Sequence, residues 1–403
     1  MKLTVSKYLN ARIDKPSTFS DCILYRAPGF VIDIDDVVTG TEIEGNGVWV
    51  HSKDDGYFYW SGGFAENDFV FPGKEFPDFN DEDKIILLKS AKKYYSTLLK
   101  AKVTGFKGIG VGNKNNDQTA GLALLVFVDA KVGVDQLDFV VPGNLVFKGI
   151  AMPVDVIAVG NPATAARIEY KNNENLRLDN GSKLGMGGSI SYMDDNDNVN
   201  EYGSRTIIVI NDQNKKNYLM SCFHVLLPAL VKSGDAIYYN ANDIRCQVPS
   251  SKLQARNSFD VLTVFEGYYD GGYDYAVAEI ANIGGCVNGV DQARFADYYK
   301  IDEIDSLLNK PVKIYGATSY IQSATVNNPN CDVELDCRGI RREYVGLIST
   351  DKVTTGGDSG GPVTDNAGKL IGYVVGATND NQFTYILPVY NLFSNRGYSL
   401  FKS

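Results

Sequence analysis

The sequence lacks several features that define common classes of protein. Among its 403 residues, no apolar run approaches the roughly 20 residues of a membrane-spanning helix, so we expect no membrane insertion. The formal net charge of −10 argues against a nucleic-acid surface or an anionic membrane as a partner. Residues 1–30 contain no continuous apolar core and no A-x-A site, which argues against a secretory signal peptide.

Cysteine is scarce, and no pair of cysteines has the spacing of zinc ligands. Only Cys331 and Cys337 are close enough in sequence to suggest a disulfide. Since no signal peptide is evident, we expect reduced thiols and a cytoplasmic location. The acidic run Asp194–Asp197 lacks the glycine and glutamate of an EF-hand, so we expect neither a metal nor another cofactor.

Glycine and tyrosine are abundant, with 40 and 25 residues, and 44% of the chain is hydrophobic. Many turns between half-buried strands explain this composition, which predicts a mainly β protein. The length predicts two or three domains.

Residues 1–64 form the first expected domain. Short strand-like runs separated by Gly and Asp turns predict a small barrel or sandwich. The opening Leu9-Asn10-Ala11-Arg12, together with Trp49, Asp55-Gly56 and the closing Trp60-Ser61-Gly62-Gly63, resembles a bacterial SH3-like domain. Its two tryptophans are the only ones in the chain. They belong either to the core or to an aromatic groove for a peptide or glycan partner.

Residues 65–180 are expected to contain a linker, a helix and a small α/β domain. Asn80 can cap a helix over 81–102, where acidic residues lead and lysines follow, as the helix dipole favours. The glycine-rich run 105–112 has the look of a phosphate loop. It leads into a polar turn and a strand over 122–128 rather than a helix, so we reject that interpretation.

A second glycine-rich run, Gly357-Asp358-Ser359-Gly360-Gly361-Pro362, lies near the C-terminal end. Core strands avoid glycine, so the run needs another explanation. A tight turn here can direct the N–H groups of Gly357 and Ser359 into one hollow, and such a pair of donors stabilises the oxyanion of acyl transfer. The run resembles the nucleophile loop of chymotrypsin-like serine proteases, of the intracellular bacterial type.

A serine nucleophile needs a base, and the base needs an orienting carboxylate. His224 follows an apolar strand, as the base does in that family, although Phe223 stands where intracellular members have asparagine. Because the family orders its triad His, Asp, Ser, the resemblance implies Asp274 as the carboxylate. Asp260 and Asp270 are the alternatives.

The resemblance implies that residues 181–403 form a trypsin-like double six-stranded β-barrel with the site between the barrels. The expected fold is therefore mainly β and multidomain, with the SH3-like and α/β domains preceding the protease domain. In the family that the chain resembles, an aspartate six residues before the nucleophile selects Lys or Arg, and Val353 stands at this position here. Together with Val375 and Ala377, it implies a pocket for an apolar or small side chain.

Three functions remain open at this point. The first is a serine endopeptidase acting on protein or peptide substrates, regulated or targeted by its N-terminal domains. The second is a catalytically silent pseudo-protease that serves as a scaffold, and the third is an esterase. No activation cleavage site is evident, so we expect Asp358 to have a partner other than a new N-terminus.

Overall fold

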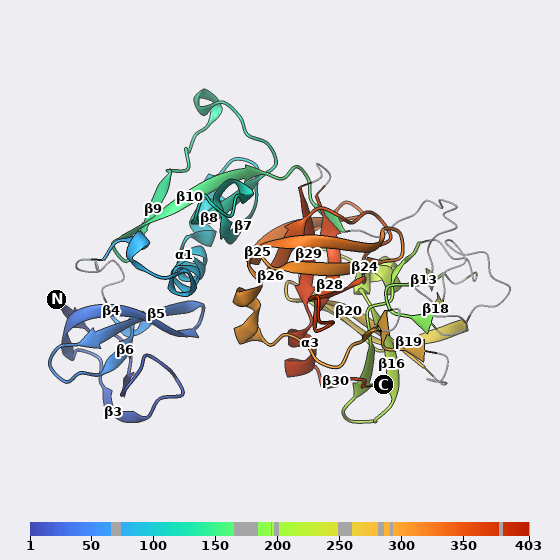
Figure 1. Cartoon of the computed structure of the whole chain (residues 1–403), viewed down its shortest axis with the longest axis horizontal. Coiled ribbons are helices and arrows are strands. Elements are labelled where there is room, and N and C mark those ends of the chain that lie inside the picture. The colour runs from blue at the N-terminus through green and yellow to red at the C-terminus, as the bar shows by residue number, and fades with distance from the viewer. Residues whose placement is uncertain are drawn as a thin grey trace. The chain divides into compact units, whose positions relative to one another are not determined.

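The computed structural model describes residues 1–65, 74–164, 184–194, 196, 201–248, 260–280, 286–290, 293–378 and 382–402. The chain forms two compact units, Met1–Ala158 and Val159–Ser403, both rich in β structure (Figure 1). The mainly β, multidomain fold class expected from the sequence is confirmed. Among the residues described, no helix has both the length and the apolar character needed to cross a bilayer.

The first unit begins with a six-stranded sheet in the order β1-β4-β5-β6-β2-β3. Its strands are β1 (Lys2–Thr4), β2 (Leu9–Arg12), β3 (Cys22–Arg26), β4 (Val31–Ile43), β5 (Asn46–Ser52) and β6 (Phe58–Trp60). β4 and β5 are joined by Glu44 and Gly45, which both have positive φ. Two left-handed residues are what a tight hairpin with twisted strands requires.

The two tryptophans of this sheet make backbone hydrogen bonds. Trp49 is only 2% exposed, and its indole N–H donates to the Thr41 carbonyl. The indole of Trp60 donates to the Asn46 carbonyl. Trp49 therefore belongs to the core, and the exposed aromatic side chains of this sheet region are Tyr8, Phe19, Tyr25 and Phe30.

The rest of the first unit contains helix α1 (Asp81–Lys102) and four strands in the order β7-β8-β10-β9. The Asn80 side chain accepts the Asp83 N–H and caps α1, as expected from the sequence. The strands are β7 (Phe106–Asn113), β8 (Leu122–Val128), β9 (Asn144–Phe147) and β10 (Ile150–Ala158). Because residues 106–112 of the glycine-rich run themselves lie in strand β7, the run does not open a helix as a phosphate loop would.

The second unit contains two barrels. The first has the strand order β14-β13-β18-β19-β20-β16-β15-β30. Its strands are β13 (Ser189–Met193), β14 (Gly203–Ser204), β15 (Ile208–Asn211), β16 (Asn217–Ser221), β18 (Arg245–Val248), β19 (Asp260–Asp270), β20 (Tyr273–Glu279) and β30 (Tyr398–Leu400), and β17 (Ile237–Tyr239) adds to β19. β14 and β15 lie on one continuous run of chain. That run therefore pairs with both ends of the sheet and curls it into a barrel.

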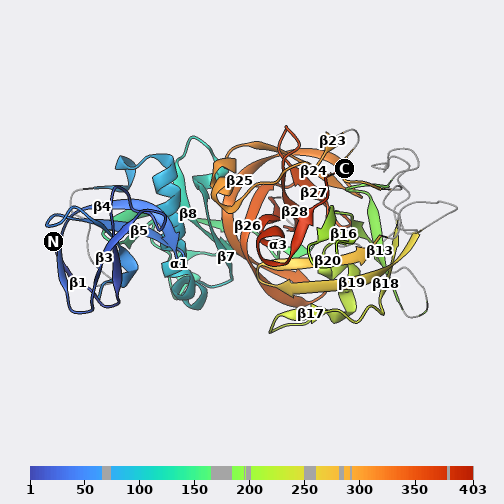
Figure 2. The same ribbon diagram turned by 90° about the horizontal axis from the view of Figure 1, so that it is seen from below.

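The second barrel has the order β24-β27-β28-β29-β26-β25, and pairing of β25 with β24 closes the ring (Figure 2). Its six strands are β24 (Pro311–Gly316), β25 (Tyr320–Cys337), β26 (Ile340–Asp351), β27 (Pro362–Thr364), β28 (Leu370–Ala377) and β29 (Phe383–Pro388). Its interior is filled mainly by aliphatic side chains such as Val326, Ile348 and Val374. Cys331 and Cys337 both lie on β25 as buried free thiols, so the suggested disulfide is not formed.

The remaining strands and α-helices of the second unit are short. They are β11 (Ala163–Thr164), β12 (Leu184–Gly185), β21 (Cys286–Val287), β22 (Gly289–Val290), β23 (Ala293–Arg294), α2 (Phe223–Leu226) and α3 (Tyr390–Asn395).

Candidate active site

His224 and Asp274 meet because the strands that carry them are antiparallel neighbours. β16 ends at Ser221, which pairs with Ala276 on β20. The chain continues past Ser221 into the single turn of α2, which holds His224, while Asp274 lies near the start of β20. His224 lies three residues after Ser221, and Asp274 lies two residues before Ala276. Because the two strands are antiparallel, a step forward on β16 and a step backward on β20 lead in the same direction, and the two side chains come together.

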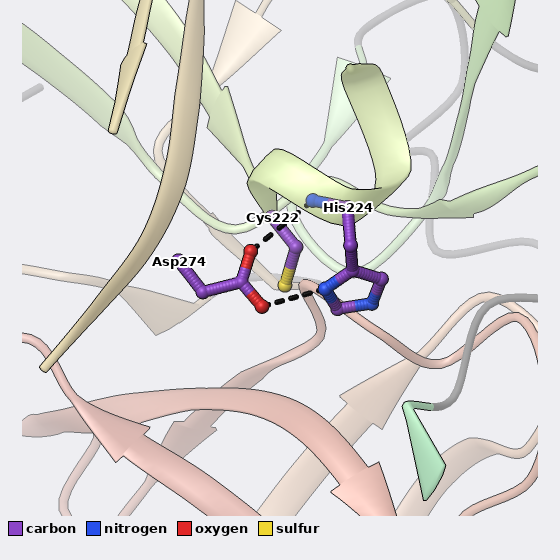
Figure 3. Close-up of side chains that lie close together, drawn as sticks. All are labelled: Cys222, His224 and Asp274. Carbon is purple, nitrogen blue, oxygen red and sulfur yellow. Dashed lines mark hydrogen bonds and ion pairs between the residues drawn. The ribbon is translucent and has the colours of Figure 1, made fainter. Parts of the chain in front are cut away.

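The imidazole of His224 links a carboxylate to a hydroxyl. Its Nδ1 lies 2.6 Å from Asp274 Oδ2, and its Nε2 lies 2.8 Å from Ser359 Oγ. The backbone N–H of His224 also donates to Asp274 Oδ1, which holds the carboxylate in the plane needed to orient the ring (Figure 3). All three side chains are 0% exposed. The structure thus brings together the three residues selected from the sequence.

The alternative carboxylates lie elsewhere. Asp260 is exposed at the start of β19, and the Asp270 side chain accepts the Gly272 N–H within a hairpin turn.

The loop between β26 and β27 carries Ser359 and fixes two peptide planes around it. The Gly356 carbonyl accepts the Thr318 hydroxyl at 2.8 Å, so in a trans peptide the Gly357 N–H points the opposite way. The Asp358 carbonyl accepts the Gly361 N–H, which fixes the Ser359 N–H in the same manner.

These two N–H groups, from Gly357 and Ser359, have no hydrogen-bond acceptor within the described part of the chain. Buried N–H groups are normally paired, so two unpaired donors beside a serine hydroxyl are available for a ligand oxygen. Gly357 has a φ of +98°, and an added Cβ would lie 2.2 Å from the Thr318 hydroxyl. Only glycine therefore fits this position.

The Asp358 carboxylate is fully buried, and four donors surround it. They are the N–H groups of Thr318, Ser319 and Thr355 and the Ser319 hydroxyl. Burial raises the pKa of Asp358 above its ordinary value, although these hydrogen bonds act in the opposite direction. The carboxylate has a partner within its own domain, namely the loop that follows β24.

Sequence reasoning missed the tyrosines that surround Asp274. The Tyr344 hydroxyl donates to Asp274 Oδ2 at 2.7 Å, and the Tyr373 hydroxyl donates to the Asp274 carbonyl at 3.2 Å. Ser204 was also missed: its hydroxyl donates to the Gly357 carbonyl, and its N–H donates to the Ser359 carbonyl. No local motif marks these residues, because their partners are 70 to 155 positions away in the sequence.

Cys222 lies beside the pair formed by His224 and Asp274, and the possible ligand atoms of the three residues are within 4.8 Å of one another (Figure 3). These atoms already have partners, since the Cys222 thiol donates to the Val374 carbonyl and His224 Nδ1 bonds Asp274. Burial, together with the nearby Asp274 carboxylate, raises the pKa of Cys222 well above its ordinary value. The thiol therefore stays protonated, a form unsuited to metal ligation.

The three residues selected for the substrate pocket lie in two places. Val375 and Ala377 are both buried on β28, whose pairing with β29 shifts register between Val374 and Gly376. Val353 is half-buried and packs against the core of the second barrel, while its N–H donates to the Thr384 hydroxyl.

No protein-family model and no curated protein sequence matches the chain. Solved structures that match include protease A from Thermobifida fusca, with 18% identity, a TM-score of 0.37 and coverage of 55% of this chain and 100% of that chain. A chymotrypsin from Cellulomonas bogoriensis matches at 14% identity and a TM-score of 0.37, over 55% and 100% of the two chains. The active form of a protease from M. tuberculosis matches at 18% and 0.32, over 53% and 81%. TM-scores below 0.5 support no conclusion about activity, so only the geometry of the site itself bears on its chemistry.

Proposed function

We propose that this chain is a serine endopeptidase that hydrolyses peptide bonds through an acyl-enzyme. The observation that carries the proposal is the hydrogen-bonded series from Asp274 through His224 to Ser359, with distances of 2.6 and 2.8 Å. Beside it lie two N–H groups that have no acceptor among the residues described. A carboxylate, an imidazole and a hydroxyl in this order are the parts of an activated nucleophile.

The roles follow from this geometry. Ser359 Oγ attacks the substrate carbonyl carbon while His224 Nε2 takes its proton. The N–H groups of Gly357 and Ser359 stabilise the resulting oxyanion. The peptide C–N bond then breaks, His224 gives its proton to the departing amine, and water releases the acyl group by the same steps in reverse. Asp274 orients the imidazole and stabilises its charged form.

The pocket and the N-terminal unit belong to the same proposal. Val353, Val375 and Ala377 present apolar surfaces without a carboxylate, which suits an apolar or small side chain next to the scissile bond. The N-terminal sheet serves as a regulatory or targeting arm in this scheme. Its exposed Tyr8, Phe19 and Tyr25 offer aromatic surface to a peptide or glycan.

A fluorophosphonate probe tests the proposal, because it reacts with serine hydroxyls that a neighbouring base activates. We expect the full-length protein to be labelled and Ser359→Ala to remain unlabelled. Ser306→Ala is the matched control, since Ser306 is exposed and donates to the Glu303 carbonyl away from the site. A wild-type protein that stays unlabelled under all conditions would instead favour the pseudo-protease scaffold.

A further inference from the structure

The edge of β28 leads directly to Ser359. One edge of β28 pairs with β29, and the other pairs with β27 only as far as Tyr373. At the next residue, Val374, the N–H donates to Gly361 and the carbonyl accepts from Gly360, the two residues that follow Ser359. A strand that pairs with Gly376 and Ala377 is therefore in line with the nucleophile loop.

The chain itself supplies such a strand. β11 pairs antiparallel with β28, with Ala163 opposite Ala377 and Thr164 opposite Gly376. On its other side β11 runs parallel to β25, where Ala163 lies opposite Asp336 and the Asp336 N–H donates to the Pro162 carbonyl. Although β11 is only two residues long, it therefore pairs with a neighbouring strand on each edge.

The direction of β11 matters as much as its position. Passing from Ala163 to Thr164 moves along β28 from Ala377 to Gly376, toward Val374 and the Ser359 loop. Each residue of an extended strand advances about 3.3 Å. Only Val375 separates Gly376 from Val374, so β11 points its C-terminal end at the nucleophile from about two residues away.

Two further observations fit a strand in this position. An added Cβ on Gly376 would lie 2.7 Å from the Ala163 carbonyl oxygen, so glycine is what lets the two backbones approach. In addition, Ser359 and His224 are 0% exposed. A substrate carbonyl must contact Ser359 Oγ, so part of the chain has to move before an external substrate can bind.

We propose that β11 is an internal, substrate-like strand that occupies the peptide-binding edge of β28 and competes with external substrates. The proposal rests on the endopeptidase function above. It also defines the substrate class: an extended peptide with small side chains at the positions that Ala163 and Thr164 occupy. Main-chain pairing supplies the affinity in this mode of recognition, and the preference for small side chains follows from the residues of β11 itself.

The test compares Ala163→Pro/Thr164→Pro with Ala163→Ser/Thr164→Ser in the full-length protein. Proline removes the N–H of both residues. Successive N–H groups point to opposite edges, so one donor is lost toward each neighbouring strand. Serine keeps both donors and is small, which makes the serine pair the matched control. The substrate is a chromogenic peptide amide whose last residues are Asn-Pro-Ala-Thr-Ala.

We expect the proline pair to lower the KM for this peptide by about tenfold with little change in kcat, because a site occupied for nine-tenths of the time weakens apparent affinity by that factor. The serine pair should behave like wild type. The fluorophosphonate probe is too small to need the β28 edge, so it should label all three proteins. Equal KM values in three labelled proteins would overturn the strand proposal alone, whereas absence of label in all three would overturn the endopeptidase function on which it rests.

A second measurement needs no variant and so does not depend on the proline pair folding. An extended peptidyl phosphonate binds both Ser359 and the β28 edge, so it should raise the amide hydrogen exchange of Ala163 and Thr164 in the wild-type protein. The small fluorophosphonate should leave it unchanged. Unaltered exchange with the extended inhibitor bound would contradict the proposal. Intact mass checks the register: any Ser359-dependent hydrolysis within the chain is expected within about two residues after Thr164, and a cut before Ala163 would contradict it.

Discussion

The Tyr344 hydroxyl lies 2.7 Å from Asp274 Oδ2, although Tyr344 comes from the second barrel and Asp274 from the first. Behind it, the Tyr269 hydroxyl lies 3.0 Å from that of Tyr344, and the Arg342 guanidinium covers the Tyr269 ring at 4.5 Å. Arg342 also donates to the carbonyls of Gly234 and Asp235. Strand β26 therefore links the Asp274 carboxylate of the first barrel to the second barrel.

Tyr344→Phe should lower kcat/KM by about tenfold, since a hydrogen bond to a charged group contributes about 1.5–3 kcal/mol. Burial and the nearby Asp274 carboxylate raise the pKa of Tyr344 well above its ordinary value, so the hydroxyl donates at every working pH. A carboxylate that has lost this donor holds the imidazolium more strongly. The acid limb of the pH profile should therefore move to higher pH.

The control for this prediction is Tyr299→Phe, which removes another tyrosine–aspartate hydrogen bond, to Asp365, away from the site. Its pH profile should match that of the wild type. If Tyr344→Phe changes only thermal stability and leaves the profile where it was, Tyr344 has a structural role and does not position Asp274.

Gly357→Ala should lower kcat by about two to three orders of magnitude, the cost of losing one oxyanion donor. The new Cβ would lie 2.2 Å from the Thr318 hydroxyl and 2.4 Å from the Tyr202 ring, so the peptide plane must turn. Gly368→Ala is a matched control, because Gly368 also has a positive φ but no atom lies within 4 Å of its Cβ position. Steady-state kinetics of both variants will separate loss of the donor from backbone strain. Similar losses in the two would refute the oxyanion role.

Asp358 should make the protein less stable as the pH rises. Burial raises the pKa of Asp358 in the folded state above its ordinary value of 3.8. At a pH between the ordinary pKa and the folded-state pKa, the folded state therefore binds more protons than the unfolded state. The stability that this proton contributes is present below the ordinary value and is lost as the pH rises through the folded value. In urea unfolding across this pH range, Asp358→Asn should remove this part of the pH dependence.

Glu303→Gln is the matched control, because Glu303 contributes a pH dependence of stability opposite in sign to that of Asp358. The pKa of Glu303 is lowered by the Lys300 N–H and the Lys369 ammonium, so its contribution is present above the ordinary value and is lost as the pH falls. A wild-type curve that does not differ from that of Asp358→Asn in its pH dependence would show that Asp358 is not the responsible group.

Substrate preference gives a fourth prediction. Val353, Val375 and Ala377 provide no negative charge, and β11 places small residues on the β28 edge. In a fluorogenic peptide library we therefore expect cleavage after apolar or small residues. Cleavage confined to Lys and Arg would contradict this expected preference.

Several local features of the chain were correctly predicted from the sequence. Asn80 and the acidic first turn define the start of α1, because capping acts within one turn of chain. The glycine-rich run 105–112 was correctly interpreted as leading into a strand, since phosphate loops open helices. The expected reduced thiols are confirmed for Cys331 and Cys337, which lie on one extended strand as buried free thiols. Spacing in sequence does not reveal which strand lies opposite.

The sequence by itself determined the chemistry available to this protein: one serine among glycines, one histidine after an apolar strand, and one aspartate opening the next. Such residues are recognisable because turn geometry and strand patterns depend on neighbours along the chain. Only the tertiary structure decided which distant groups surround them, as with Tyr344, 70 residues from Asp274, and Ser204, 153 residues from Gly357. The pairing of β11 with β28 was likewise decided only by the tertiary structure. Main-chain hydrogen bonds leave no side-chain pattern in the sequence by which the partner strand could be identified.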